Sequence, residues 1–128
     1  MRILVTGRSG QLATALVEQA ATRPDIDLIA LGRPAIDLER PRETEAAIIA
    51  ARPDFVVNVA AYTAVDRAES EPDHAFAINR DGATAVARAA AHLGVPLIHL
   101  STDYVFDGTK PHPSSRALGQ PPAGPRFQ

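Results

Sequence analysis

Three small residues spaced for phosphate binding stand near the N-terminus. Gly7, Gly10 and Ala13 recur at every third position directly after the apolar run Ile3–Val5. Gly7 permits a tight turn, Gly10 lets the backbone approach a phosphate, and Ala13 is small enough for a helix to pack closely on a strand. The spacing predicts that a helix N-terminus here binds the pyrophosphate of a dinucleotide. A tight turn that binds nothing is the alternative.

A second candidate site follows the predicted strand 27–31. An acidic residue at the end of this strand would bind a ribose 2′-hydroxyl and favour NAD, but the sequence has Arg33, just after Gly32. A guanidinium offers a planar fork of donors that suits the 2′-phosphate of NADP, and Arg8 can assist. Asp37 is then free to hold the adenine amino group. A solvated loop arginine and a turn or cap carboxylate are the alternatives.

The segment 58–66, NVAAYTAVD, leaves a third predicted strand, 55–59, at its carboxyl end. Ligands of open α/β sheets bind outside the carboxyl ends of the strands. The small residues Ala60 and Ala61 would let the backbone lie against a flat cofactor, and Tyr62 could stack on it or hydrogen-bond to it. A plain loop with a core tyrosine is the alternative.

Other polar residues carry weaker signals. Ser101, Thr102 and Asp103 end the fourth predicted strand and could bind a carbonyl or sugar hydroxyls, although an Asx or Ser/Thr turn is the simpler interpretation. We predict no metal site. The histidines have no ligand spacing, the acidic residues between positions 66 and 73 are typical of a solvated helix face, and His99 is interpreted as a satisfied sheet residue. These histidines and acids are His74, His92, His99, His112, Asp66, Glu69, Glu71 and Asp73.

Strands and helices alternate along the chain. Apolar runs predict strands over 2–6, 27–31, 55–59 and 95–101, and helical patterns predict helices over 11–22, 41–52, 64–70 and 72–93. The strands lack polar alternation, which is typical of an α/β, Rossmann-like parallel sheet with helices on both faces. Right-handed crossovers predict the strand order 3-2-1-4. We expect this sheet to be incomplete at its C-terminus.

Length and composition limit the classes of protein to which this chain can belong. The 128 residues, 45% hydrophobic, are enough for one domain with a core. A net charge of −2 argues against nucleic-acid binding, and the absence of cysteine excludes disulfides and thiolate metal sites. No run of membrane-spanning length or signal segment is evident, so a cytoplasmic location is expected. We predict a partial NAD(P)-binding domain over 1–110 and a disordered tail over 111–128, which holds five prolines and two glycines.

Four motifs together resemble a known family. VTGRSGQLA, NVAAYTAVDRAESEP, AINRDGA and STDYVFDGT are similar to segments of dTDP-4-dehydrorhamnose reductases, in the extended short-chain dehydrogenase/reductase superfamily. The second and fourth motifs are the more specific, and the resemblance covers residues 1 to about 110. It implies reduction of the 4-keto group of dTDP-4-dehydro-L-rhamnose to dTDP-L-rhamnose by NADPH, or by NADH. The resemblance further implies a homodimer for the full-length protein and a use of Mg²⁺, although no Mg²⁺ site can be identified in this sequence.

The resemblance also implies roles for individual residues. The residues meeting the cofactor phosphates would be Gly7, Gly10, Gln11 and Leu12. Those around the adenosine would be Arg33, Asp37 and Leu38, and those leading to the nicotinamide would be Ala60, Ala61, Tyr62 and Thr63. Asn79 matches a helix asparagine usual in the superfamily. Thr102 matches the catalytic hydroxyl that hydrogen-bonds the keto oxygen, and Asp103 matches a substrate contact.

The sequence departs from the family at its general acid. The family's Tyr-x-x-x-Lys is missing, because Tyr62 is followed four residues later by Asp66, Tyr104 is followed by Gly108, and no lysine follows Lys110. We therefore expect a truncated or frameshifted reductase with poor activity. A non-catalytic NADP(H)-binding or regulatory module is the alternative. Part of a sugar-nucleotide epimerase or dehydratase is a third interpretation, which AAYTAVDRAESEP disfavours.

Overall fold

The computed structural model describes residues 1–101. Four strands alternate with helices, as predicted, although several elements are shorter than expected. The strands are β1 (Arg2–Thr6), β2 (Asp27–Leu31), β3 (Phe55–Asn58) and β4 (Leu97–His99). The helices are α1 (Gln11–Ala20), α2 (Pro41–Ala51), α3 (Val65–Ser70), α4 (Pro72–Phe76), the π-helical segment η1 (Ala77–Gly82) and α5 (Ala83–Leu93). Thr102, Asp103 and the predicted tail lie outside the described residues.

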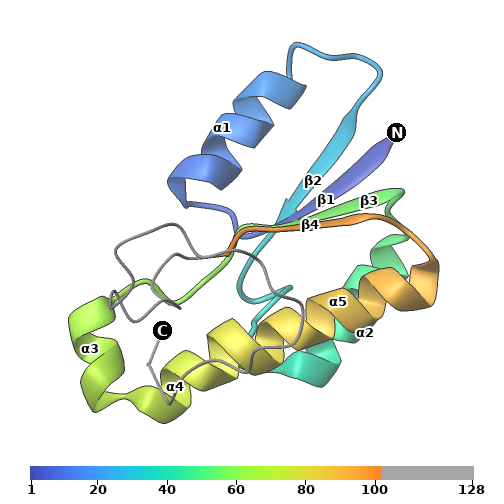
Figure 1. The fold of residues 1–128 in the computed structure, drawn as a ribbon. Coiled ribbons are helices and arrows are strands. Elements are labelled where there is room, and N and C mark those ends of the chain that lie inside the picture. The colour runs from blue at the N-terminus through green and yellow to red at the C-terminus, as the bar shows by residue number, and fades with distance from the viewer. Residues whose placement is uncertain (102–128) are drawn as a thin grey trace, which may run out of the picture.

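The four strands form one parallel sheet in the order β2-β1-β3-β4. The predicted order 3-2-1-4 is therefore wrong, because β3 pairs with β1 and not with β2. Helix α1 lies on one face of the sheet and α2 on the other (Figure 1). Right-handed crossovers on opposite faces run in opposite directions, so β2 and β3 come to lie on either side of β1. The chain therefore reverses its direction of travel across the sheet after β2, whereas the predicted order places this reversal after β3.

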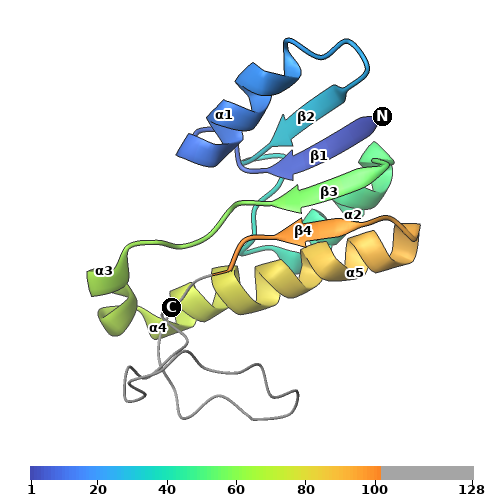
Figure 2. The ribbon, with the colours of Figure 1, turned by 45° about the horizontal axis from the view of Figure 1, so that its top comes forward.

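Helices cover both faces of the sheet, as predicted. Figure 2 shows α1 on the face opposite to α2 and α5, which pack against each other. The main core lies on the α2–α5 side and includes Leu4, Ile48, Val56 and Val86, each fully buried. Burying one such side chain stabilises the fold by about 1.5–3 kcal/mol. None of the helices in this described part is long and apolar enough to cross a bilayer.

The predicted helix 72–93 is one continuous helical run with a π-helical segment inside it. The backbone remains right-handed helical from α4 through η1 into α5, and the run ends at Gly94, whose φ is +66°. Within this run, Gly82 touches the loop after β2: a Cβ placed on it would lie 2.5 Å from Leu38 Cβ and 2.6 Å from the Leu38 carbonyl oxygen. Only glycine allows this close approach, which fixes Leu38 beside the sheet edge.

Candidate functional site

A cleft of about 1150 Å³ lies at the carboxyl edge of the sheet. Three chain segments meet there: the turn between β1 and α1, the loop after β2 and the loop after β3. Every residue predicted to contact a cofactor lines this cleft: Gly7, Gly10, Gln11, Leu12, Arg33, Asp37, Leu38, Ala60, Ala61, Tyr62 and Thr63. That they hold a cofactor remains a prediction, and its physical basis is the convergence of the three strand ends.

The turn between β1 and α1 has the geometry that the glycine spacing predicts. Gly7 has a φ of +100°, and its N–H donates to the Leu31 carbonyl over 2.6 Å, which ties the turn to β2. A Cβ on Gly10 would meet no protein atom within 4 Å, so the space beside this backbone is open. Ala13 is fully buried, as close helix–strand packing requires. The N-terminus of α1 is therefore free to meet an anion.

Two arginines lie where β2 ends. The Arg33 side chain is 74% exposed, and its Nη1 lies 3.8 Å from Glu39 Oε1. The Arg8 side chain lies against Gly32, since a Cβ on that glycine would be 3.1 Å from Arg8 Cγ. Asp37 Oδ1 accepts a hydrogen bond from the Glu39 N–H over 3.2 Å. This contact is the one expected of a turn carboxylate, which is the alternative interpretation of Asp37. Both guanidiniums lie at the cleft wall.

Asn79 fixes the main chain of Tyr62. Its Oδ1 accepts from the Tyr62 N–H over 2.8 Å, and its Nδ2 donates to the Tyr62 carbonyl over 3.0 Å. One side chain from η1 therefore satisfies both polar groups of a loop residue, replacing the partners that a longer strand would supply. The asparagine expected from the family resemblance thus has a definite structural role, because it positions the loop after β3 along the cleft.

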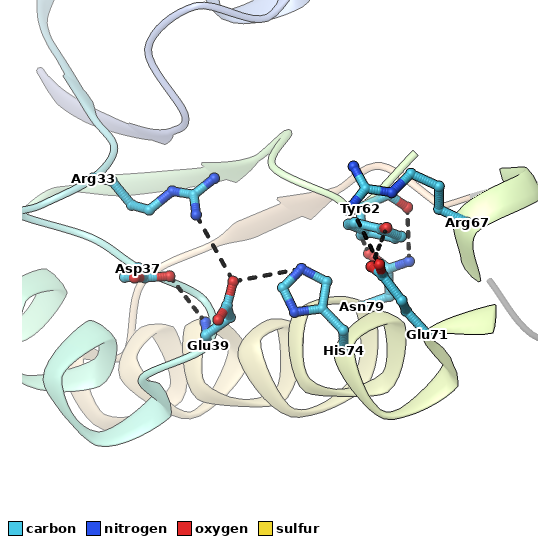
Figure 3. A network of polar contacts seen from close by, with 8 residues as sticks. All are labelled: Arg33, Asp37, Glu39, Tyr62, Arg67, Glu71, His74 and Asn79. Carbon is cyan, nitrogen blue, oxygen red and sulfur yellow. Dashed lines mark hydrogen bonds and ion pairs between the residues drawn. The ribbon is translucent and has the colours of Figure 1, made fainter. Parts of the chain in front are cut away.

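The side chain of Tyr62 is held by α3 and α4 (Figure 3). Its hydroxyl donates to Glu71 Oε2 over 3.0 Å, and Arg67 Nη2 donates to Glu71 Oε1 over 3.2 Å. The ring meets His74 edge-on, with centroids 4.9 Å apart. Burial and the hydrogen bond to Glu71 raise the pKa of Tyr62, while the hydrogen bonds from Tyr62 and Arg67 lower the pKa of Glu71. At neutral pH the phenol therefore keeps its proton, and this tyrosine is held in place as a hydrogen-bond donor.

Buried polar groups support the start of the same loop. The Thr6 hydroxyl donates to Asn58 Oδ1, and both side chains are buried. Thr6 Oγ1 accepts from the N–H groups of Val59 and Ala60 over 3.3 and 3.4 Å. Asn58 Nδ2 and His99 Nδ1 are 2.9 Å apart, which agrees with the interpretation of His99 as a satisfied sheet residue. These hydrogen bonds fix the main chain where the loop leaves β3.

Sequence reasoning missed part of the cleft wall. Glu39, Arg67, Glu71 and His74 all line it, although Glu71 was assigned to a solvated helix face and His74 to no role. The Glu71 side chain is 40% exposed, as on a solvated face, but it also accepts a hydrogen bond from Tyr62 at the point where Pro72 starts a new helix. Pro72 directly follows Glu71 in the sequence, and this helix break is the signal from which the position of Glu71 could have been predicted. Over residues 1–101, no cluster of three His, Cys, Asp or Glu side chains could hold a metal ion.

Together, the parallel sheet, the glycine turn and the cleft at the strand ends define an α/β protein of the Rossmann-like class. The chain belongs to the protein family described as RmlD substrate binding domain, whose model matches residues 1–124. This agrees with the family resemblance of its motifs.

Named relatives agree with this family. The chain is 60% identical, over 113 residues, to a dTDP-4-dehydrorhamnose reductase from Sinorhizobium fredii, covering 88% of this chain and 38% of the relative. It is 43% identical over 112 residues to the reductase of the same name from Escherichia coli, covering 84% and 37%. The chain thus spans less than half the length of these relatives.

Solved structures show the same fold. A dTDP-4-dehydrorhamnose reductase from Bacillus anthracis, in complex with NADP, matches with a TM-score of 0.78 and 36% identity over 86% of this chain and 39% of that one. A dTDP-4-dehydrorhamnose reductase from Clostridium acetobutylicum matches with a TM-score of 0.83 and 33% identity over 95% and 43%. A UDP-glucose 4-epimerase from Thermotoga maritima, at 22% identity, shares the fold alone.

Proposed function

We propose that this chain binds NADPH, with NADH as the weaker ligand, in the cleft at the carboxyl edge of the sheet. One observation carries the proposal: three segments far apart in sequence bring every predicted cofactor residue to one cleft of dinucleotide size. The pyrophosphate would lie on the N-terminus of α1 beside Gly10, and the adenosine between Arg33 and Leu38. The loop from Ala60 to Thr63 would lead toward the nicotinamide.

The reaction that this cofactor site would serve is reduction of the 4-keto group of dTDP-4-dehydro-L-rhamnose to dTDP-L-rhamnose. The support is the family membership, the relatives' names and the NADP complex of a similar protein. When bound, NADPH would supply the hydride. Thr102 and Asp103 are the candidates for contacts with the keto oxygen and the sugar. We further propose a cytoplasmic location and, for the full-length protein, a homodimer.

Turnover by these 128 residues alone would be slow. The sequence contains no Tyr-x-x-x-Lys, and Tyr62 is hydrogen-bonded to Glu71 with its proton retained. Losing a general acid typically slows a reaction by about 10²–10⁴-fold. A non-catalytic NADP(H)-binding module therefore remains the second candidate, and the missing pair is the observation that favours it.

Isothermal titration calorimetry of the purified chain with NADPH and with NADH tests the cofactor assignment. Saturable binding with a stoichiometry of one supports it, and absence of heat with both dinucleotides refutes it. Incubation with dTDP-4-dehydro-L-rhamnose and NADPH, followed by the loss of NADPH absorbance, separates the two candidates. Slow but measurable ketosugar reduction would contradict the second candidate, and binding without any turnover would favour it.

A further inference from the structure

The end of the cleft near β2 is rich in charge. Arg8, Arg33, Asp37, Glu39 and His74 all line it. The following inference rests on the proposed function, because it assumes that the adenosine of a dinucleotide lies at this end. The two arginines are the only fixed cations of the set, and the two carboxylates oppose them. The charges of these two arginines and two carboxylates balance, so the loss of one carboxylate would leave the set net positive.

One oxygen of Glu39 lies near side-chain nitrogens of both Arg33 and His74 (Figure 3). Its Oε1 lies 3.8 Å from Arg33 Nη1 and 3.6 Å from His74 Nε2. The Glu39 side chain is 34% exposed, so its charge is only partly screened by water. The Glu39 N–H is also held by Asp37, which fixes where this residue stands. Arg33 and a protonated His74 therefore compete for the same carboxylate oxygen.

The other groups that face His74 leave Glu39 as its carboxylate partner. Tyr62 presents its ring edge-on and donates its hydroxyl to Glu71. Glu71 also accepts from Arg67, so both of its oxygens already have partners. Asp73 precedes His74 in α4 but forms no ion pair with it among the described residues. Glu39 is thus the one carboxylate that forms an ion-pair contact with His74 within residues 1–101.

We propose that Glu39 and His74 set the preference of this cleft for a ribose 2′-phosphate over a 2′-hydroxyl. With neutral His74, the Glu39 carboxylate faces Arg33 and repels a 2′-phosphate. With protonated His74, the imidazolium neutralises the Glu39 carboxylate. The Arg33 guanidinium can then bind the 2′-phosphate in place of Glu39. Glu39 is in this sense a specificity-determining residue, and His74 is the side chain placed to offset its charge.

The expected effect follows from the charges. Exchanging Glu39 for glutamine removes one negative charge beside Arg33 and should raise the NADP⁺/NAD⁺ affinity ratio by about fivefold, as expected for a partly exposed pair acting on a phosphate. His74 contacts the same carboxylate from the other side, so exchanging it for glutamine should change how this ratio responds to pH. The 2′-phosphate itself titrates near pH 6, and this contribution is common to all variants.

The experiment is calorimetric titration of the whole chain with NADP⁺ and with NAD⁺ at pH 6 and pH 8. The variants are Glu39→Gln and His74→Gln. The matched controls are Glu43→Gln, which makes the same change of net charge on exposed surface away from the cleft, and His92→Gln, an exposed histidine in α5. Thermal unfolding of each variant verifies that it is folded.

We expect Glu39→Gln to raise the NADP⁺/NAD⁺ ratio at pH 8 and Glu43→Gln to leave it unchanged. On going from pH 8 to pH 6, the ratio should rise more for the wild type and His92→Gln than for His74→Gln. Equal ratios in the wild type and Glu39→Gln, or identical pH profiles with and without His74, would overturn the inference alone. A wild-type chain that binds neither dinucleotide would instead refute the proposed function, and this inference with it.

Discussion

Replacing Gly82 with alanine should destabilise the fold through a single contact. The new Cβ would lie 2.5 Å from Leu38 Cβ, 2.6 Å from the Leu38 carbonyl oxygen and 3.0 Å from Leu38 Cα. Two of these atoms are backbone, so no rotation of a side chain can relieve the overlap. Either the helical run or the loop after β2 must move, which costs about 2–3 kcal/mol, the upper part of the usual range, because the overlaps are with backbone.

A second effect acts in the opposite direction. Alanine is favoured over glycine inside a helix by about 0.5–1 kcal/mol, so the net loss expected for Gly82→Ala is about 1–2 kcal/mol. For a domain of this size, each kcal/mol lowers Tm by roughly 4 °C. We therefore expect Tm to fall by about 4–8 °C. Thermal unfolding followed by far-UV circular dichroism measures it.

Gly10→Ala is the matched control for this substitution. The added Cβ meets no protein atom within 4 Å, and the φ of −74° suits alanine, so the stability change should be only about 0.5 kcal/mol. If Gly82→Ala were as stable as the wild type, or more stable, then the contact with Leu38 would not constrain the loop. Leu38 would then be fixed beside the cleft by something other than this contact.

Three further predictions concern the cleft. Gly10→Ala should leave Tm nearly unchanged yet weaken NADPH binding at least tenfold in calorimetry, because its Cβ occupies the space needed by the pyrophosphate; unchanged affinity would contradict that placement. Asn79→Ala should lower the free energy of unfolding by about 1–3 kcal/mol in urea titration, because the polar main-chain groups of Tyr62 lose both partners; a smaller loss would mean that water replaces them. The pKa of Glu71 is lowered from its ordinary 4.5, so its contribution to stability is present above pH 4.5 and declines as the pH falls below it. Glu71→Gln should therefore lose less stability than the wild type between pH 4.5 and pH 3 in thermal melts, and parallel curves would contradict this.

Local sequence patterns were sufficient for the elements and for the glycine turn. Apolar runs such as Ile3–Val5 and helix signals such as Pro41 and Gly94 act over a few residues, so each element could be predicted from its own segment. The residues predicted to contact a cofactor could be expected to lie together because strand ends in a parallel sheet converge at one edge. The convergence of Gly7, Arg33 and Tyr62 on one cleft agrees with that reasoning.

Features that depend on tertiary contacts could not be predicted in this way. The strand order depends on which face α2 covers, and no local pattern encodes that choice. The π-helical segment lies where Gly82 meets Leu38, a residue from a distant part of the sequence. Glu71 is hydrogen-bonded to Tyr62 from the loop after β3, so in the sequence alone its charge resembles part of a solvated helix face.

The most direct test of the cleft as a dinucleotide site is calorimetric titration of the wild-type chain with NADPH, alongside Gly10→Ala. We predict one saturable site per chain in the wild type and at least tenfold weaker binding in the variant, with both proteins equally folded. Absence of binding by the folded wild-type chain, or equal affinity of the two proteins, would contradict the assignment of the cleft as a dinucleotide site.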